Sequence, residues 1–175
     1  MDGVYRPIGV RTTATIRNCP RRRQLRLMPH NVEGMSTAPA PESSPEFTLD
    51  LVILDCPDPM ALAGFYSALL GWPLEEGSDD HWATLIPPGG GVSAERPDGR
   101  ATLAFQRIDD YVAPTWPGGT HPQQFHLDIS VADIDASEPA VLAAGATVHE
   151  HQPAKDDGFR VYLDPAGHPF CLIRR

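Results

Sequence analysis

The chain has 175 residues and a mass of 19.0 kDa, with 41% hydrophobic residues, 21% charged residues and a formal net charge of −9. This composition is typical of a water-soluble globular protein, and no stretch approaches the about 20 apolar residues that a membrane span needs. The negative charge disfavours nucleic acid as a partner, because phosphate binding needs a basic surface. Cys19, Cys56 and Cys171 are too few and too scattered for a disulfide framework or a Cys-based zinc site, so a cytoplasmic location is expected.

The first 34 residues differ in charge from the rest of the chain. They hold seven arginines and two acidic residues, a balance of +5, whereas residues 35–175 carry −14. We interpret residues 1–46 as a disordered extension ending in a Pro/Ser-rich linker, because such a stretch cannot bury a core. The run Arg21-Arg22-Arg23 leaves open a basic arm or a transit peptide. Met35 is an alternative start of translation, since Val32-Glu33-Gly34 can be encoded by a purine-rich, ribosome-binding-like stretch.

The predicted secondary structure begins at Phe47. Residues 47–55 form a β-prone run, and Asp58 and Pro59 are a suitable N-cap and first residue of a helix that Gly71 ends. Strands are expected at 82–86 and 101–108. The order then repeats, with a strand at 124–131, a helix capped by Asp133 and ended by Gly145, and strands at 146–149, 159–163 and 168–173.

The two halves of this region match each other. Residues 51–58 align with 126–133, Leu70-Gly71 with Ala144-Gly145, and Phe105-Gln106 with Phe170-Cys171. Each half has the pattern βαβββ, and one such unit cannot cover both faces of its sheet. The two units are therefore expected to join into one α+β domain. We place this domain at 47–174, with module one at about 47–108, a connector at 109–123 and module two at 124–174.

Five segments carry a resemblance to a known family: Leu54–Pro59, Phe65–Trp72, Trp116-Pro117, Gln124–Asp128 and Asp164–Leu172. Over about residues 47–173 the chain resembles the vicinal oxygen chelate superfamily in its glyoxalase-like branch, the glyoxalase, bleomycin-resistance and dioxygenase type. The resemblance implies paired βαβββ modules that form a curved mixed sheet around a cleft. It is not specific for a reaction, because the family also includes epimerases, thiol-transferring resistance enzymes and drug-sequestering proteins. Some relatives exchange modules between subunits, so a homodimer is one of the arrangements that the resemblance implies.

The resemblance also implies a divalent-metal site with a first-strand His and a last-strand Glu from each module. The matching positions here are Leu51, Gln106, His126 and Cys171. Leu51 has no donor atom, Gln106 offers only a weak amide oxygen, and Cys171 favours softer ions. We therefore expect no stoichiometric metal or other cofactor, and no glyoxalase I activity. The alternative is a divalent metal at an incomplete zinc site that includes His126 and Cys171.

The alternation of side chains along each strand predicts which residues face the cleft. In 126–131 the apolar residues share one face, which packs under the helix, so His126 and Asp128 face the cleft on the other side. These two are candidates for substrate orientation or general acid–base catalysis, because an imidazole pKa lies near neutrality. The alternative is a His–Asp pair at a wet surface. The candidate ligand-binding residues are Leu51, Ile53, Gln106, Trp116, His126, Asp128 and Cys171.

Two tryptophans and a histidine pair are weaker candidates. Trp82 and Trp116 are suited to stacking on an aromatic ligand, although a buried core position is the favoured alternative for Trp82. His149 and His151 form a His-x-His pair, which we assign to a solvated edge because no third ligand is in view.

Three function classes stay open. The first is a metal-independent protein that binds or sequesters a small apolar or aromatic compound. The second is a lyase, isomerase or dioxygenase-type enzyme that acts on a small carbonyl or phenolic substrate through His126. The third is a structural or regulatory module with an inactive cleft. The missing ligands favour the first and third classes over a standard metalloenzyme, and the polar residues around His126 favour the first and second over the third.

Overall fold

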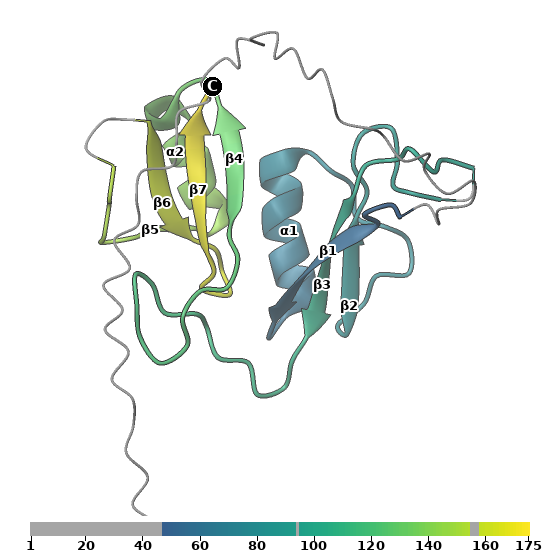
Figure 1. The fold of residues 1–175 in the computed structure, drawn as a ribbon, viewed down its shortest axis with the longest axis horizontal. Helices are drawn as coiled ribbons and strands as arrows, with labels where there is room; N and C mark the ends of the chain where they lie inside the picture. Colours follow the sequence, from purple (N-terminus) through teal and green to yellow (C-terminus); the bar gives the residue numbers. More distant parts are fainter. Residues whose placement is uncertain (1–46, 94, 155–157) are drawn as a thin grey trace, which may run out of the picture. The chain divides into compact units, whose positions relative to one another are not determined.

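The structure, a computed structural model, describes residues 47–93, 95–154 and 158–175. The expected extension at 1–46 and the alternative start at Met35 lie outside these residues. The described part is an α+β fold in which the order of elements follows the predicted repeat (Figure 1). Its elements are β1 (Leu51–Cys56), α1 (Pro59–Leu70), β2 (Trp82–Leu85), β3 (Thr102–Arg107), β4 (Leu127–Val131), α2 (Ile134–Ala144), β5 (Thr147–Val148), β6 (Phe159–Leu163) and β7 (Pro169–Arg174).

Both helices begin and end at the predicted residues. The carboxylate of Asp58 accepts a hydrogen bond from the Ala61 backbone N–H at 3.0 Å, and that of Asp133 accepts one from Ala136 at 2.9 Å. Each N-cap thereby satisfies a backbone N–H that has no partner within the helix. Gly71 and Gly145 follow the last turns with φ of 68° and 119°, in the left-handed region that favours glycine. Neither helix has the length and apolar character of a membrane span.

The strands of the described residues form two mixed sheets, with the orders β1-β3-β2 and β4-β7-β6-β5. In each sheet the first strand of the module pairs in parallel with the last one. Within the described residues, module one has three strands rather than the four of the βαβββ pattern, and Leu74 forms only an isolated bridge with Leu85. No strand pairing in the described part joins the two sheets. The curved mixed sheet that the resemblance implies is present here as two small mixed sheets, one in each module.

The strand register corrects one alignment made from the sequence. Asp58 and Asp133 cap equivalent helices, so Ile53 and Asp128 occupy equivalent positions in β1 and β4. Ile53 lies opposite Ala104, whereas Asp128 lies opposite Cys171. The counterpart of Cys171 is therefore Ala104, and the predicted match of Gln106 with Cys171 is wrong by two residues. Both registers keep the same face of the strand, because side chains alternate with a period of two.

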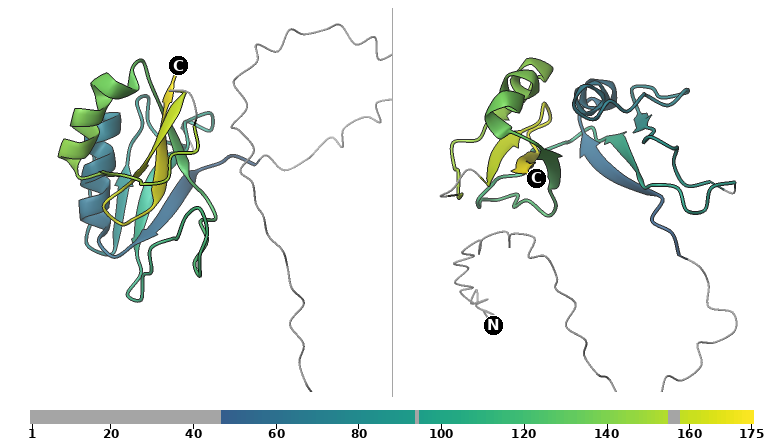
Figure 2. Two further views of the ribbon diagram at one scale, coloured as in Figure 1. Left: turned by 90° about the vertical axis from the view of Figure 1, so that its left-hand side faces the viewer. Right: turned by 90° about the horizontal axis from the view of Figure 1, so that it is seen from above.

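One hydrophobic core contains residues of both modules. Tyr66 of α1 stacks on Phe105 of β3 at 5.6 Å between ring centroids and meets Phe170 of β7 edge-on at 6.3 Å. The helices α1 and α2 also contact each other, as the view from above shows (Figure 2). In β1 the core side chains are Val52, Leu54 and Cys56. Leu51, Ile53 and Asp55 therefore belong to the opposite face of the sheet, as the alternation predicts.

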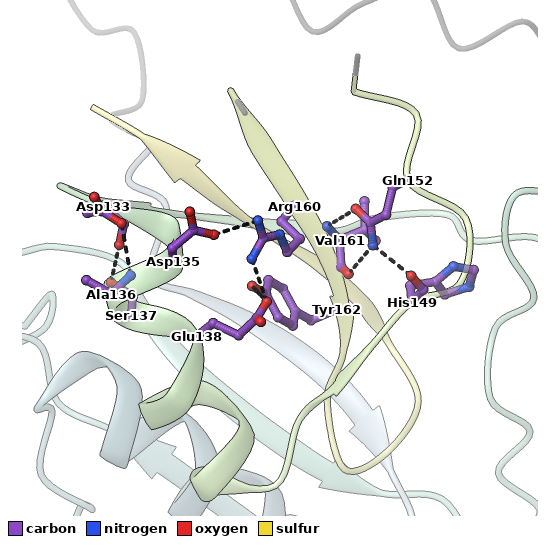
Figure 3. A network of polar contacts seen from close by, with 10 residues as sticks. All are labelled: Asp133, Asp135, Ala136, Ser137, Glu138, His149, Gln152, Arg160, Val161 and Tyr162. Carbon is purple, nitrogen blue, oxygen red and sulfur yellow. Dashed lines mark hydrogen bonds and ion pairs between the residues drawn. The ribbon is translucent and has the colours of Figure 1, made fainter. Parts of the chain in front are cut away.

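A charged cluster fixes α2 against β6 (Figure 3). The Arg160 guanidinium donates hydrogen bonds to Glu138 at 2.7 Å and to Asp135 at 2.8 Å. The Tyr162 hydroxyl donates a further bond to Glu138 at 2.8 Å. Hydrogen bonds from Arg160 and Tyr162 hold the pKa of Glu138 below its ordinary value. The cluster therefore favours an ionised Glu138 and stabilises the outer side of module two.

Candidate functional site

The structure brings three of the predicted site residues together on module two. Asp128 of β4 lies opposite Cys171 of β7, and His126 immediately precedes β4 on the same face as Asp128. One ligand atom of each residue lies within 4.8 Å of those of the other two. The His126 Nε2 atom is 3.4 Å from the Asp128 carboxylate, and their side chains are 48% and 36% exposed. Cys171 lies deeper, at 9% exposure. The face that these residues share is therefore accessible from solvent.

The donors of this cluster differ from those that the family resemblance implies. The four implied positions are divided between the sheets, with Leu51 and Gln106 on module one and His126 and Cys171 on module two. Leucine offers no ligand atom, and an amide oxygen is a weak one, so these four residues do not fit a hard octahedral ion. On module two, the carboxylate of Asp128 joins the nitrogen and sulfur donors. Alternation predicted that Asp128 lies beside His126, but the sequence did not indicate it as a metal ligand, because its place opposite Cys171 depends on the pairing of β4 with β7.

A cavity of about 370 Å³ lies on the module-one sheet, on the face opposite the core. Leu51, Trp82, Thr84 and Thr102 come from the three strands of this sheet, and alternation places all four on that face. Thr84 and Thr102 are only 6% and 5% exposed. The remaining lining residues are Asp50, Glu75, Ile86, Gly91, Val92, Ser93 and Arg96. None of His126, Asp128 and Cys171 lines this cavity. A single site that combines these three residues with Leu51 and Gln106 of module one therefore stays a prediction.

Trp82 departs from the core position that the sequence favoured. Its side chain lines the cavity, and the residue is 36% exposed. The indole Nε1–H donates a 2.9 Å hydrogen bond to the Thr84 hydroxyl, which lies two residues along β2 on the same face. The core positions of this strand belong to Ala83 and Leu85 instead. The alternation in β2 carried this signal, since small and aliphatic residues suit the buried side.

The other predicted ligand-binding residues lie elsewhere. Ile53 is 44% exposed on β1, and Gln106 lies opposite Trp82 at the exposed end of β3. Trp116 lies in the connector between β3 and β4. Its ring packs edge-on against His149 and His151, with ring centroids 5.0 and 5.1 Å away. These two histidines therefore meet an aromatic ring as well as solvent. None of these five residues is among those that line the module-one cavity.

A buried polar network near the end of the chain was not predicted. The Asp164 carboxylate, with no exposed side-chain surface, lies 2.9 Å from His168 Nδ1 and accepts a 3.0 Å hydrogen bond from Tyr66. On its other side, His168 Nε2 lies 3.0 Å from the Tyr111 hydroxyl of the connector. Because an ionised carboxylate only accepts, Nδ1 of His168 is the donor to Asp164. The network links the connector, α1 and the turn before β7.

Cys56 and Cys171 differ in their surroundings. Cys56 is fully buried in the core, and burial raises the pKa of its thiol to about 11. The thiolate is the reactive and metal-binding form of cysteine, so this thiol is inert at neutral pH. Cys171 lies on the opposite face of its sheet, next to Asp128. Of the two, Cys171 is therefore the one placed for chemistry.

Comparison with known proteins gives a family match over most of the described region. A family model described as a glyoxalase-like domain matches residues 51–173. A glyoxalase/bleomycin resistance protein/dioxygenase family enzyme from Burkholderia phytofirmans PsJN has a similar structure, with a TM-score of 0.51 and 17% identity over 72% of this chain and 97% of that chain. At this identity the likeness supports the fold alone.

Two further structures have lower TM-scores. A glyoxalase/bleomycin resistance protein from Albidiferax ferrireducens T118 is 19% identical, covers 72% of this chain and 97% of its own, and has a TM-score of 0.48. A glyoxalase family protein from Enterococcus faecalis is 19% identical, covers 73% and 97%, and also has a TM-score of 0.48. No curated protein matches the chain significantly.

Proposed function

Because the chain belongs to the glyoxalase-like domain family, we propose that it binds a small apolar or aromatic compound in the module-one cavity. The observation that carries this proposal is the cavity of about 370 Å³, whose wall contains Leu51 and a partly exposed Trp82. Its volume falls within the about 300–1,000 Å³ typical of small-molecule pockets. Such a pocket joins apolar walls to a few polar groups that orient the ligand.

The lining residues favour a planar compound with at least one polar group. The Trp82 indole is held by its hydrogen bond to Thr84, so its ring can offer a fixed face for stacking. Thr84 and Thr102 add hydroxyl groups on the floor of the cavity. Asp50, Glu75 and Arg96 add charged groups at its wall. Recognition of this kind needs no metal ion.

A matched pair of tryptophan variants tests this proposal. A set of small aromatic and aliphatic compounds is screened by ligand-observed NMR against the full-length, metal-free protein. For the compounds that bind, Trp82→Ala should weaken affinity about tenfold or more, which corresponds to 1.4 kcal/mol. Trp116→Ala removes the other tryptophan predicted to meet a ligand, and it should leave affinity unchanged because that ring lies against His149 and His151. Equal affinities of wild type and Trp82→Ala would exclude the cavity as the binding site.

A second candidate function is catalysis through His126. The observation in its favour is the 3.4 Å separation between His126 Nε2 and the Asp128 carboxylate, because an acidic partner can orient an imidazole for proton transfer. The substrate would be a small carbonyl or phenolic compound. Hydrogen–deuterium exchange beside the carbonyl group of small ketones and aldehydes, followed by NMR in D₂O, measures such activity directly. His126→Ala should abolish the exchange, and exchange that persists in this variant would assign it to other groups.

The same measurements separate both functions from the third class. A folded protein that binds none of the compounds and catalyses no exchange would favour the structural or regulatory module. His81→Ala is the control variant for catalysis. This histidine also has an acidic neighbour, Asp80 at 3.8 Å, but the pair is 77% and 72% exposed.

A further inference from the structure

We infer that His126, Asp128 and Cys171 form a three-ligand site for a thiophilic divalent ion, best suited to zinc, within module two alone. This inference goes beyond the proposed binding of a small compound and does not depend on it. The two sites share no residue, because none of the three lines the module-one cavity. It also departs from the arrangement implied by the resemblance, in which each module gives two ligands to one ion.

The distances within the cluster match a tetrahedral ion. Zinc binds histidine nitrogen, carboxylate oxygen and thiolate sulfur at about 2.0–2.3 Å, which places tetrahedral ligand atoms about 3.3–3.8 Å apart. The His126 Nε2 to Asp128 Oδ1 distance is 3.4 Å, and all three donor atoms lie within 4.8 Å of one another. Because no separation exceeds 4.8 Å, a movement of about 1 Å is enough to bring the donor atoms to this geometry. Rotation of a side chain is enough for a movement of that size.

The backbone holds the three residues in suitable positions. His126 and Asp128 are two residues apart, so they point to the same side, and the β4–β7 ladder puts Cys171 directly opposite Asp128. The opposite faces of β4 and β7 pack into the core through residues such as Ile129 and Leu172. Asp128 and Cys171 therefore lie on paired strands and His126 directly adjoins one of them, which favours a fixed geometry for these ligands.

The types of donor decide which ion the site prefers. A neutral imidazole, a carboxylate and a thiolate form a mixed nitrogen, oxygen and sulfur set, which suits zinc better than magnesium or calcium. Two of the groups are anionic in the bound state, so they neutralise the charge of a divalent ion. When bound, zinc keeps a fourth position for water or for an atom of a ligand, as in sites with three protein ligands.

Cobalt(II) provides a direct test of the sulfur ligand. Full-length protein is stripped with a chelator and titrated with cobalt(II), then with zinc in competition with a chromophoric chelator. We expect one equivalent of either ion per chain, the intense visible bands of four-coordinate cobalt and a thiolate-to-cobalt charge-transfer band. His126→Ala, Asp128→Asn and Cys171→Ser should each weaken zinc binding at least about tenfold. Loss of a residue that only hydrogen-bonds to a metal ligand already weakens binding about 10- to 100-fold, so loss of a ligand should cost no less.

Two controls keep this inference falsifiable. His81→Ala removes a histidine that also neighbours an aspartate, and it should leave zinc affinity unchanged. Circular dichroism shows whether each variant is folded, and the wild-type cobalt spectrum does not depend on any variant. The inference is overturned if wild type binds less than one equivalent, lacks the charge-transfer band, or loses affinity only in His81→Ala. Because the compound screen uses metal-free protein, a failure here leaves the proposed function standing, and the reverse also holds.

Discussion

The Tyr66 hydroxyl of α1 donates a 3.0 Å hydrogen bond to the carboxylate of Asp164, which is buried in the turn before β7. Asp164 also accepts bonds of 2.9 Å from the backbone N–H groups of Ala166 and His168, so it organises its own turn as well as the contact with α1. Burial and the neighbouring Asp164 raise the pKa of Tyr66, so its hydroxyl stays protonated and able to donate. One carboxylate therefore connects the helix of module one with the last turn of module two.

We predict that Tyr66→Phe lowers the free energy of unfolding by about 1.5–3 kcal/mol, the usual cost of losing a hydrogen bond to a charged group. The cost is high because the variant leaves a buried oxygen of Asp164 without one of its donors. Urea denaturation followed by circular dichroism measures the change.

Tyr162→Phe is the matched control, because Tyr162 is also fully buried and also donates to a carboxylate. Its acceptor, Glu138, is 28% exposed and keeps the bond from Arg160, so we expect a loss of only about 0.5–1.5 kcal/mol. A larger loss in Tyr162→Phe than in Tyr66→Phe would contradict the role given to Asp164.

The acidic limb of the stability curve should depend on Glu138. Arg160 and Tyr162 lower its pKa in the folded protein below the ordinary value of 4.5, so the folded state binds a proton less tightly than the unfolded chain does. The stability that Glu138 contributes is therefore fully present above pH 4.5 and is lost as the pH falls through the lower folded pKa. Glu138→Gln should flatten the fall in stability below pH 4.5.

Thermal unfolding of the two proteins between pH 3 and 6, roughly the range in which carboxyl groups titrate, measures this difference. Asp135→Asn is the control, since Asp135 also meets Arg160 but is 73% exposed and its ion pair is screened by water. We expect this variant to change the acid dependence less than Glu138→Gln does. Parallel acid limbs in wild type and Glu138→Gln would show that the cluster does not couple to pH.

Local signals explain how much of the fold could be predicted. Asp58 with Pro59, and Gly71 with the turn before it, fix the ends of α1 through their own backbone preferences. Alternation assigned Leu51 and Val52 to opposite faces of β1 without knowledge of its partner strand. These features depend on residues close together in the sequence, and the structure confirms them.

Long-range pairing explains what the sequence did not predict. The match of Gln106 with Cys171 relied on the Phe that precedes each residue. It failed because Phe105 pairs with Leu54 and Phe170 with Leu127, which are not equivalent positions of the two modules. The contact between Asp128 and Cys171 likewise depends on strand register. A core position was favoured for Trp82 because aromatic residues are common in protein cores, although β2 buries Ala83 and Leu85 instead.

Two glycines near each other in the sequence should respond in opposite ways to the same substitution. Gly64 lies on the exposed side of α1, whereas Gly71 ends this helix with φ of 68°. A Cβ atom added at either position meets no atom within 4 Å, so packing does not distinguish them. Gly64→Ala should stabilise the protein by about 0.5–1 kcal/mol, because alanine loses less backbone entropy in a helix. Gly71→Ala should destabilise it by about 1–2 kcal/mol, the cost of a left-handed conformation for a residue with a Cβ atom. Urea denaturation of both variants measures the pair, and changes of the same sign would show that the helix does not end at Gly71 in solution.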